Sequence, residues 1–225
     1  MASSPRSGGG ARLQSIVLET LAITPSGALS PGLLSASAIA VGSIMGALGG
    51  FMVSLGHVLF ELPYVGLLVY WAEKLESRLK RFEKPLALLT AAMAVYMALG
   101  LVAAALDGHN SLTVDVESSG GLLYALGLGA WFTAFNPYFL AWWVTIGLPL
   151  VRGAAAFGAR GFAVMYVSHV WIDFAWLTLL AVAGGMLARY HAVYAAMLIA
   201  LAIMLVVFAA DIVSRSFRGK KLLPF

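Results

Sequence analysis

The amino-acid sequence predicts an all-α integral membrane protein with about six transmembrane helices. Of its 225 residues, 61% are hydrophobic and only 11% are charged, whereas roughly a quarter of the residues in a soluble domain are charged. The mean hydropathy of +0.92 agrees with this composition. Since a bilayer core of about 30 Å takes about 20 apolar residues per helix, six spans use most of the chain. We therefore expect one membrane domain.

Six apolar runs, separated by clusters of charged or turn-forming residues, are the predicted spans, with ends uncertain by roughly two to four residues. They cover residues 15–40, 43–71, 86–106, 121–147, 160–187 and 192–213. The first span contains Pro25 and Pro31, and the fourth contains Pro137. Proline lacks an N–H and clashes with the preceding helical turn. The first and fourth helices should therefore be broken or sharply kinked at proline.

The two ends of the chain are expected to lie outside the membrane domain. Residues 1–12 are rich in Gly and Ser and predict a disordered cytoplasmic tail. The six-helix domain is expected at 13–214, followed by a basic cytoplasmic tail at 215–225.

The basic residues predict how the chain is oriented. If the spans alternate in direction, thirteen of the fourteen Lys and Arg residues fall on one side, and only Arg189 falls on the other. Cytoplasmic flanks of membrane helices are enriched in Lys and Arg. Both termini are therefore expected in the cytoplasm, with the chain crossing the cell (cytoplasmic) membrane several times.

Charge and composition also exclude several classes of function. The pI of about 9.5 comes from residues in loops and tails, and no nucleic-acid-binding motif accompanies them. The absence of cysteine excludes disulfides, thiolate metal sites and cysteine catalysis. We expect neither a cofactor nor a nucleic-acid partner.

The two halves of the sequence share a pattern. His57-Val-Leu-Phe-Glu61 resembles His169-Val-Trp-Ile-Asp173, and each motif follows a proline-containing span by a similar distance. The pattern predicts two repeats of three spans. Because three is odd, the second repeat must enter the membrane from the opposite face, which is the inverted arrangement found in many secondary transporters. The repeats are expected at about 15–106 and 121–213.

The two His–acid pairs are the strongest chemical signal in the chain. Residues spaced i and i+4 share one helix face, and ionisable side chains inside a span commonly mark ion or proton paths. We therefore expect His57, Glu61, His169 and Asp173 to take part in ion coupling. Two alternatives stay open: buried His–carboxylate bonds that only hold helices together, and a divalent metal site, since imidazole and carboxylate bind such ions.

Substrate is expected near the middle of the membrane, where two broken helices expose backbone polar groups. The candidate linings are residues 24–32 and 133–137. The predicted substrate-binding residues within them are Thr24, Ser30, Pro31, Gly32, Asn136 and Pro137. For Asn136, binding the substrate and capping the exposed half-helix are both open.

Two other patterns predict packing and anchoring. Gly42, Gly46, Gly50 and Ser54 recur every four residues, which predicts close helix–helix packing. Six aromatic residues near the expected span ends are interpreted as headgroup anchors: Trp71, Tyr138, Trp142, Trp143, Tyr190 and Tyr194.

Three stretches together resemble the lysine exporter (LysE) superfamily of amino-acid efflux proteins. They are Leu29-Ser-Pro-Gly32, the Gly-rich Gly42–Gly56 before His57, and Asn136-Pro-Tyr-Phe-Leu-Ala-Trp-Trp143. The likeness covers about 15–213. The chain departs from the family pattern at Leu33, where Pro-Gly-Pro is usual, and at Tyr138, where Asn-Pro-Lys is common, so no particular substrate can be carried over.

The resemblance implies a transporter, not an enzyme, that exports amino acids or related small metabolites at the expense of an ion gradient. Its partners would be a small-molecule substrate, a coupling ion and membrane lipid, and a homo-oligomer is left open. The superfamily also resembles groups that export metal ions, so a divalent metal-ion exporter is the main alternative. An intramembrane enzyme using Ser54 beside His57 and a passive channel are the remaining ones.

Overall fold

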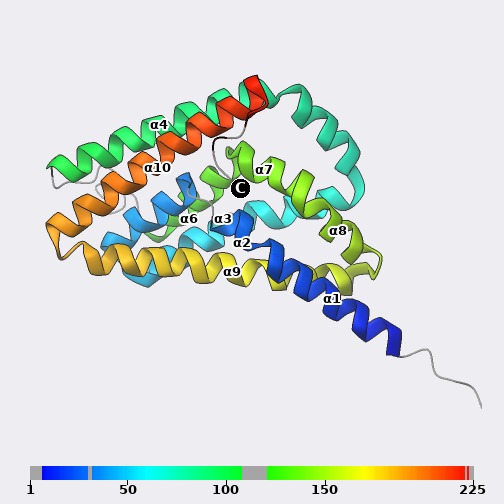
Figure 1. The fold of residues 1–225 in the computed structure, drawn as a ribbon. Coiled ribbons are helices and arrows are strands. Elements are labelled where there is room, and N and C mark those ends of the chain that lie inside the picture. Colours follow the sequence, from blue (N-terminus) through cyan, green and yellow to red (C-terminus); the bar gives the residue numbers. More distant parts are fainter. Residues whose placement is uncertain (1–6, 30–31, 108–120, 221, 223–225) are drawn as a thin grey trace, which may run out of the picture.

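The computed structural model describes residues 7–29, 32–107, 121–220 and 222, and every regular element within them is helical. Figure 1 shows the helices as an elongated bundle. In chain order they are α1 (Ser7–Ile23), α2 (Pro25–Ala28), α3 (Leu33–Arg81), α4 (Glu83–Asp107), α6 (Leu122–Ala134), α7 (Pro137–Trp142), the π-helical turn η1 (Trp143–Gly147), α8 (Leu148–Ala155), α9 (Gly158–Leu187) and α10 (His191–Arg218). The all-helical fold expected from the sequence is confirmed.

Several of these helices are suited to a membrane. Among the described residues, five helical stretches are long and apolar enough to cross one: Leu33–Trp71, Glu83–Leu106, Tyr138–Ala155, Gly158–Leu187 and His191–Arg218. The apolar helix α6 is shorter, at 13 residues. The chain is therefore a multi-pass membrane protein, as its composition predicts.

Both proline-containing spans are broken, as the sequence predicts. In the first, α1 ends at Ile23, the single turn α2 begins at Pro25, and α3 begins only at Leu33. In the second, α6 ends at Ala134 and Asn136 has an extended backbone before α7 begins. The helical path after this break continues through η1 and α8, well beyond the expected end at 147. The middle of the fourth span therefore lies further along the chain than the sequence indicates.

A glycine corner precedes each of the two helices that carry a His–acid pair. Gly46 interrupts α3 with φ of 57°, and Gly158 begins α9 with φ of 64°. This left-handed conformation is cheap only for a residue without Cβ. His57 follows Gly46 by 11 residues, and His169 follows Gly158 by the same 11. The histidine therefore lies at the same distance along the chain from the glycine corner in both helices.

Helices α3 and α9 pack closely in the centre through small residues. A Cβ on Gly42 or Gly50 would overlap atoms of Ala181 on α9, which confirms their predicted packing role. Gly46 differs from that prediction, because no atom lies near the place of its Cβ and its backbone forms the corner instead.

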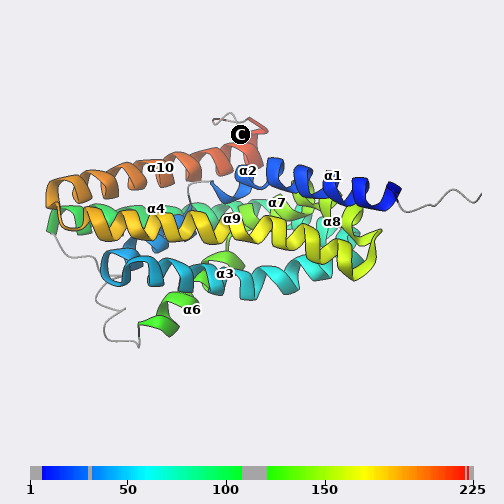
Figure 2. The same cartoon turned by 90° about the horizontal axis from the view of Figure 1, so that it is seen from below.

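Helices α6, α4 and α10 pack around this centre. Helix α6 crosses α3 so closely that a Cβ on Gly129 would overlap the backbone carbonyl of Val53. Helices α4 and α10 lie side by side along one flank in both views (Figures 1 and 2). The centre of the bundle is thus formed by the broken spans together with α3 and α9.

Candidate functional site

Four ionisable side chains meet where α3 and α9 cross. His57 and Glu61 come from α3, and His169 and Asp173 come from α9. All four residues are buried, and none has more than 6% of its surface exposed. His169 Nε2 lies 3.2 Å from Glu61 Oε1 and 3.1 Å from Asp173 Oδ2. His57 Nε2 lies 3.3 Å and 3.8 Å from the same two oxygens. The predicted pairs therefore form one group, here called the His–acid cluster.

Glu61 is the most enclosed member of this cluster, with no exposed surface. The indole of Trp143 donates a hydrogen bond to its Oε1 at 3.0 Å, and the hydroxyl of Tyr166 donates one to its Oε2 at 3.1 Å. A carboxylate removed from water is tolerated only when it is paired and hydrogen-bonded. The protein supplies donors to both of its oxygens.

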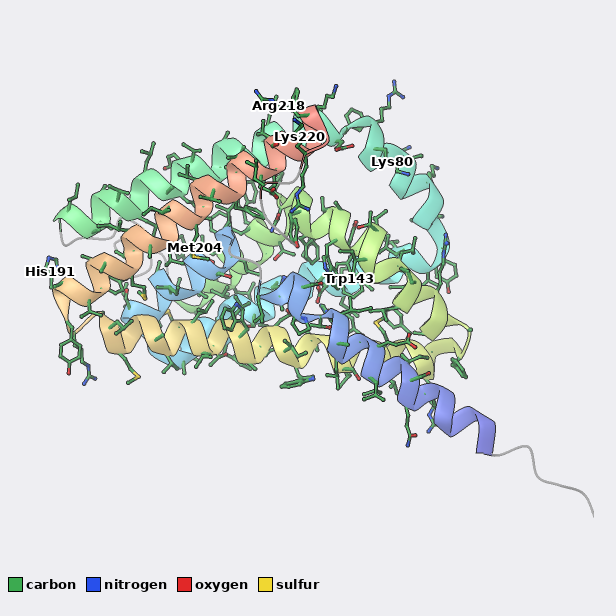
Figure 3. The ribbon with its side chains drawn as sticks, in the orientation of Figure 1. Lys80, Trp143, His191, Met204, Arg218 and Lys220 are labelled. Atoms are coloured by element: carbon green, nitrogen blue, oxygen red, sulfur yellow. The ribbon has the colours of Figure 1, made fainter. Side chains whose placement is uncertain are left out.

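The interpretation of Trp143 as a headgroup anchor is wrong. Its side chain is fully buried and lies in the middle of the molecule (Figure 3). The neighbouring Trp142 is only 4% exposed. Because the fourth span continues to Ala155, these residues lie in its interior and not at its end.

The second ring nitrogen of each histidine, Nδ1, contacts a threonine hydroxyl. His57 Nδ1 lies 2.8 Å from Thr133 Oγ1 on α6, and His169 Nδ1 lies 2.9 Å from Thr24 Oγ1, directly after α1. The threonine of each half therefore contacts the histidine of the other half. Thr24, expected to line the substrate site, is buried against His169.

A cavity of about 60 Å³ opens beside the cluster. A water molecule needs about 10–15 Å³ of such space, so the cavity holds a few waters in this conformation. Gly32 and Asn136, two of the predicted substrate-binding residues, line it together with all four residues of the His–acid cluster. Its aromatic wall consists of Tyr138, Phe139, Trp142, Trp143 and Phe208.

The remaining predicted substrate residues belong to the two breaks. Ser30 and Pro31 lie outside the described residues, and Pro137 begins α7. The side chain of Asn136 accepts hydrogen bonds from the backbone N–H groups of Tyr138 at 3.1 Å and Phe139 at 3.3 Å. Asn136 therefore caps α7, and it does so at the edge of the cavity.

The two breaks also touch each other at the cavity wall. The indole of Trp142 donates a hydrogen bond to Ser26 Oγ at 3.1 Å, and the Tyr138 hydroxyl donates one to the Ser26 carbonyl at 3.2 Å. A Cβ on Gly27 would lie 2.9 Å from the Trp142 ring. Ser26 lies within the candidate lining 24–32 but is not among the predicted binding residues, because its partners come from a distant segment of the chain.

Comparison with known proteins decides the class. The family model described as LysE type translocator matches residues 25–216. The chain belongs to the LysE type translocator family. This confirms the resemblance found in the sequence, and it places the protein among transporters, not enzymes. No curated protein matches the chain, and no solved structure matches it.

Two chemical alternatives can be compared with this geometry. In this translocator, His57, Glu61 and Asp173 offer ligand atoms that all lie within 4.8 Å of one another. These three side chains, one complete pair and the acid of the other, are therefore within reach of one divalent ion, so the geometry is compatible with a metal ion as the transported substrate. By contrast, the Ser54 hydroxyl donates to the Gly50 carbonyl at 2.9 Å, so it is not poised beside His57 as a nucleophile would be.

Proposed function

We propose that this LysE type translocator exports amino acids or related small solutes across the cytoplasmic membrane, driven by a gradient of protons or another ion. The observation that carries the proposal is the buried His–acid cluster facing a cavity at the meeting point of two broken helices. Broken helices near the midplane are where secondary transporters bind their substrates, and ionisable groups at that depth commonly carry the coupling ion.

The charges of the cluster favour a proton as the coupling ion. Two ionised carboxylates beside two neutral imidazoles would leave two negative charges in a buried site, which is costly. Two protons neutralise the cluster while it is closed to both sides of the membrane. Opening the site to either side connects it to bulk water, so that protons leave or enter there.

The cavity suits a small solute that carries an ammonium group. Asp173 faces it with a carboxylate, and the ring of Trp142 forms part of its wall. An ammonium group binds favourably to both a carboxylate and an aromatic face. Gly32 and residues 136–137 form the rest of the proposed substrate site among the described residues, and the contacts of Ser26 with Trp142 and Tyr138 separate when the cavity opens.

Alternating access follows from the matching halves. We treat 15–106 and 121–213 as inverted repeats that rock about the α3–α9 contact, within the domain at 13–214. The distribution of basic residues favours a cytoplasmic location for both termini. The substrate thus moves between a cytoplasmic and an outer opening without the helices unfolding.

Counterflow in proteoliposomes tests the proposal. A panel of amino acids is loaded inside, labelled substrate is added outside, and the pH difference is varied. We expect exchange that depends on the proton gradient and falls at least about tenfold in Asp173→Asn and His57→Gln. His191→Gln is the matched control, because His191 is exposed at the far end of α10 from Lys220 (Figure 3). Full gradient-dependent exchange in both cluster variants would reject the proposal.

A divalent metal ion is the second candidate cargo, favoured by the 4.8 Å grouping of His57, Glu61 and Asp173. The same liposomes, assayed with zinc, manganese and nickel, separate the two. Flux of metal without amino-acid exchange would replace the first candidate with the second.

A further inference from the structure

In the two threonine–histidine contacts, the other hydrogen bond of each threonine hydroxyl determines which partner is the donor. The Thr24 hydroxyl donates its single proton to the Thr20 carbonyl at 2.7 Å, and the Thr133 hydroxyl donates to the Gly129 carbonyl at 2.6 Å. A hydroxyl has one proton to give and lone pairs to accept with. Towards the histidine, each Oγ1 is therefore an acceptor only.

The histidine Nδ1 must then be the donor in both contacts. The proton that one ring nitrogen carries fixes the role of the other nitrogen. With the proton on Nδ1, the neutral ring presents a bare Nε2, and in both residues Nε2 is the atom that faces the carboxylates. The groups around it are Glu61, Asp173, the other histidine and the Tyr166 hydroxyl.

We propose that Thr24 and Thr133 are paired positioning residues, each of which holds the histidine of the opposite half in the Nδ1–H tautomer with Nε2 directed at the acids. The role deepens the proposed function and rests on it, since these are the histidines assigned to ion coupling. It assigns Thr24 to the coupling group instead of the substrate.

The position of the two threonines supports this role. Thr24 directly follows α1, and Thr133 lies in the last turn of α6, so each stands at the edge of its own helix break. Both are buried, at 0% and 1% exposure. Their partners are 145 and 76 residues away in the chain. The contact is formed twice: the threonine of the first half contacts the histidine of the second half, and the threonine of the second half contacts the histidine of the first. Side-chain packing alone does not require this reciprocal pattern.

Nitrogen NMR of the chain in lipid bilayers measures the tautomer directly. The histidine rings are labelled with ¹⁵N in a full-length chain carrying His109→Gln and His191→Gln, so that only His57 and His169 report. We expect Nδ1 of both rings to stay protonated at every pH while Nε2 changes. Thr24→Val should alter only the His169 signals, and Thr133→Val only those of His57. A deprotonated Nδ1 in either neutral ring, or unchanged histidine signals in Thr24→Val and Thr133→Val, would overturn the assignment.

Counterflow of the same variants completes the test. Loss of a hydrogen bond to a charged group corresponds to about one pH unit in proton binding, so each valine variant should move the pH of half-maximal exchange by about that much. Thr24→Ser and Thr133→Ser keep the hydroxyl and should retain the wild-type profile. If wild-type protein moves no amino acid, the proposed function fails while the NMR pattern still decides the tautomer. If the ¹⁵N spectra show the expected tautomers and the expected changes in Thr24→Val and Thr133→Val, but the pH of half-maximal exchange stays the same in both variants, the coupling role is contradicted.

Discussion

Glu61 and Asp173 occupy equivalent positions in the two halves of the chain, but their surroundings differ. Glu61 and Asp173 each lie 15 residues after a glycine corner. Glu61 has no exposed surface and accepts hydrogen bonds from Trp143 and Tyr166 as well as facing both histidines. Asp173 is 6% exposed, lies against the two histidines and lines the cavity. One acid is thus held by the protein, while the other is available to what enters the cavity.

Removing the two acids should separate these roles most clearly. Glu61→Ala leaves the Trp143 and Tyr166 donors without an acceptor and removes one of the two carboxylates beside the histidines, so we expect it to lower the free energy of unfolding by about 3–5 kcal/mol. Asp173→Ala should cost about 1–3 kcal/mol. Denaturant unfolding in detergent, followed by near-UV circular dichroism, measures both. Equal losses would show that the two acids are equally structural.

A smaller effect is expected from the donors that distinguish Glu61. Trp143→Phe keeps an aromatic ring but leaves a fully buried carboxylate oxygen with one donor fewer, at a cost of about 1.5–3 kcal/mol. Trp142→Phe removes a hydrogen bond to the exposed Ser26 and should cost only about 0.5–1.5 kcal/mol. The same unfolding assay compares them. A larger loss for Trp142→Phe would mean that the contact between the breaks, not Glu61, holds this region.

The smallest effect tests whether the two halves are alike at their corners. Gly46→Ala and Gly158→Ala should each cost about 1–2 kcal/mol, because the left-handed backbone strains any residue with Cβ while no atom obstructs that Cβ. Gly66→Ala is the matched control within a helix, also with open space, and should stabilise by about 0.5–1 kcal/mol. Unequal costs at Gly46 and Gly158 would argue against equivalent corners.

Local patterns in the sequence were sufficient for much of the site. The prolines marked both helix breaks, because the steric clash of proline acts within one turn. The i, i+4 spacing of His57 with Glu61 placed both on one face, and its repetition at 169 and 173 pointed to the second pair. Tyr166 precedes His169 by three residues and shares its face, so the same rule applied to α9 would have included it.

The contacts between the halves could not be found in this way. Which threonine meets which histidine depends on how α6 crosses α3 and how α1 meets α9, and no local pattern specifies those crossings. Trp143 was misplaced for a related reason: its depth depends on where α8 ends, and the sequence indicated an earlier end. Long-range geometry was therefore the missing information.

The crossed contacts also bear on how the chain is made. Membrane proteins are synthesised from the N-terminus, and early segments form before later ones exist. When α3 has been inserted, Glu61 has His57 beside it, but the donors from Trp143, Tyr166 and His169 have not yet been translated. The Glu61 carboxylate must therefore stay neutral or hydrated for 82 further residues until Trp143 is made, and for 108 until His169 is made. Insertion of the first half thus places an acid in the membrane before the second half can supply its hydrogen-bond donors.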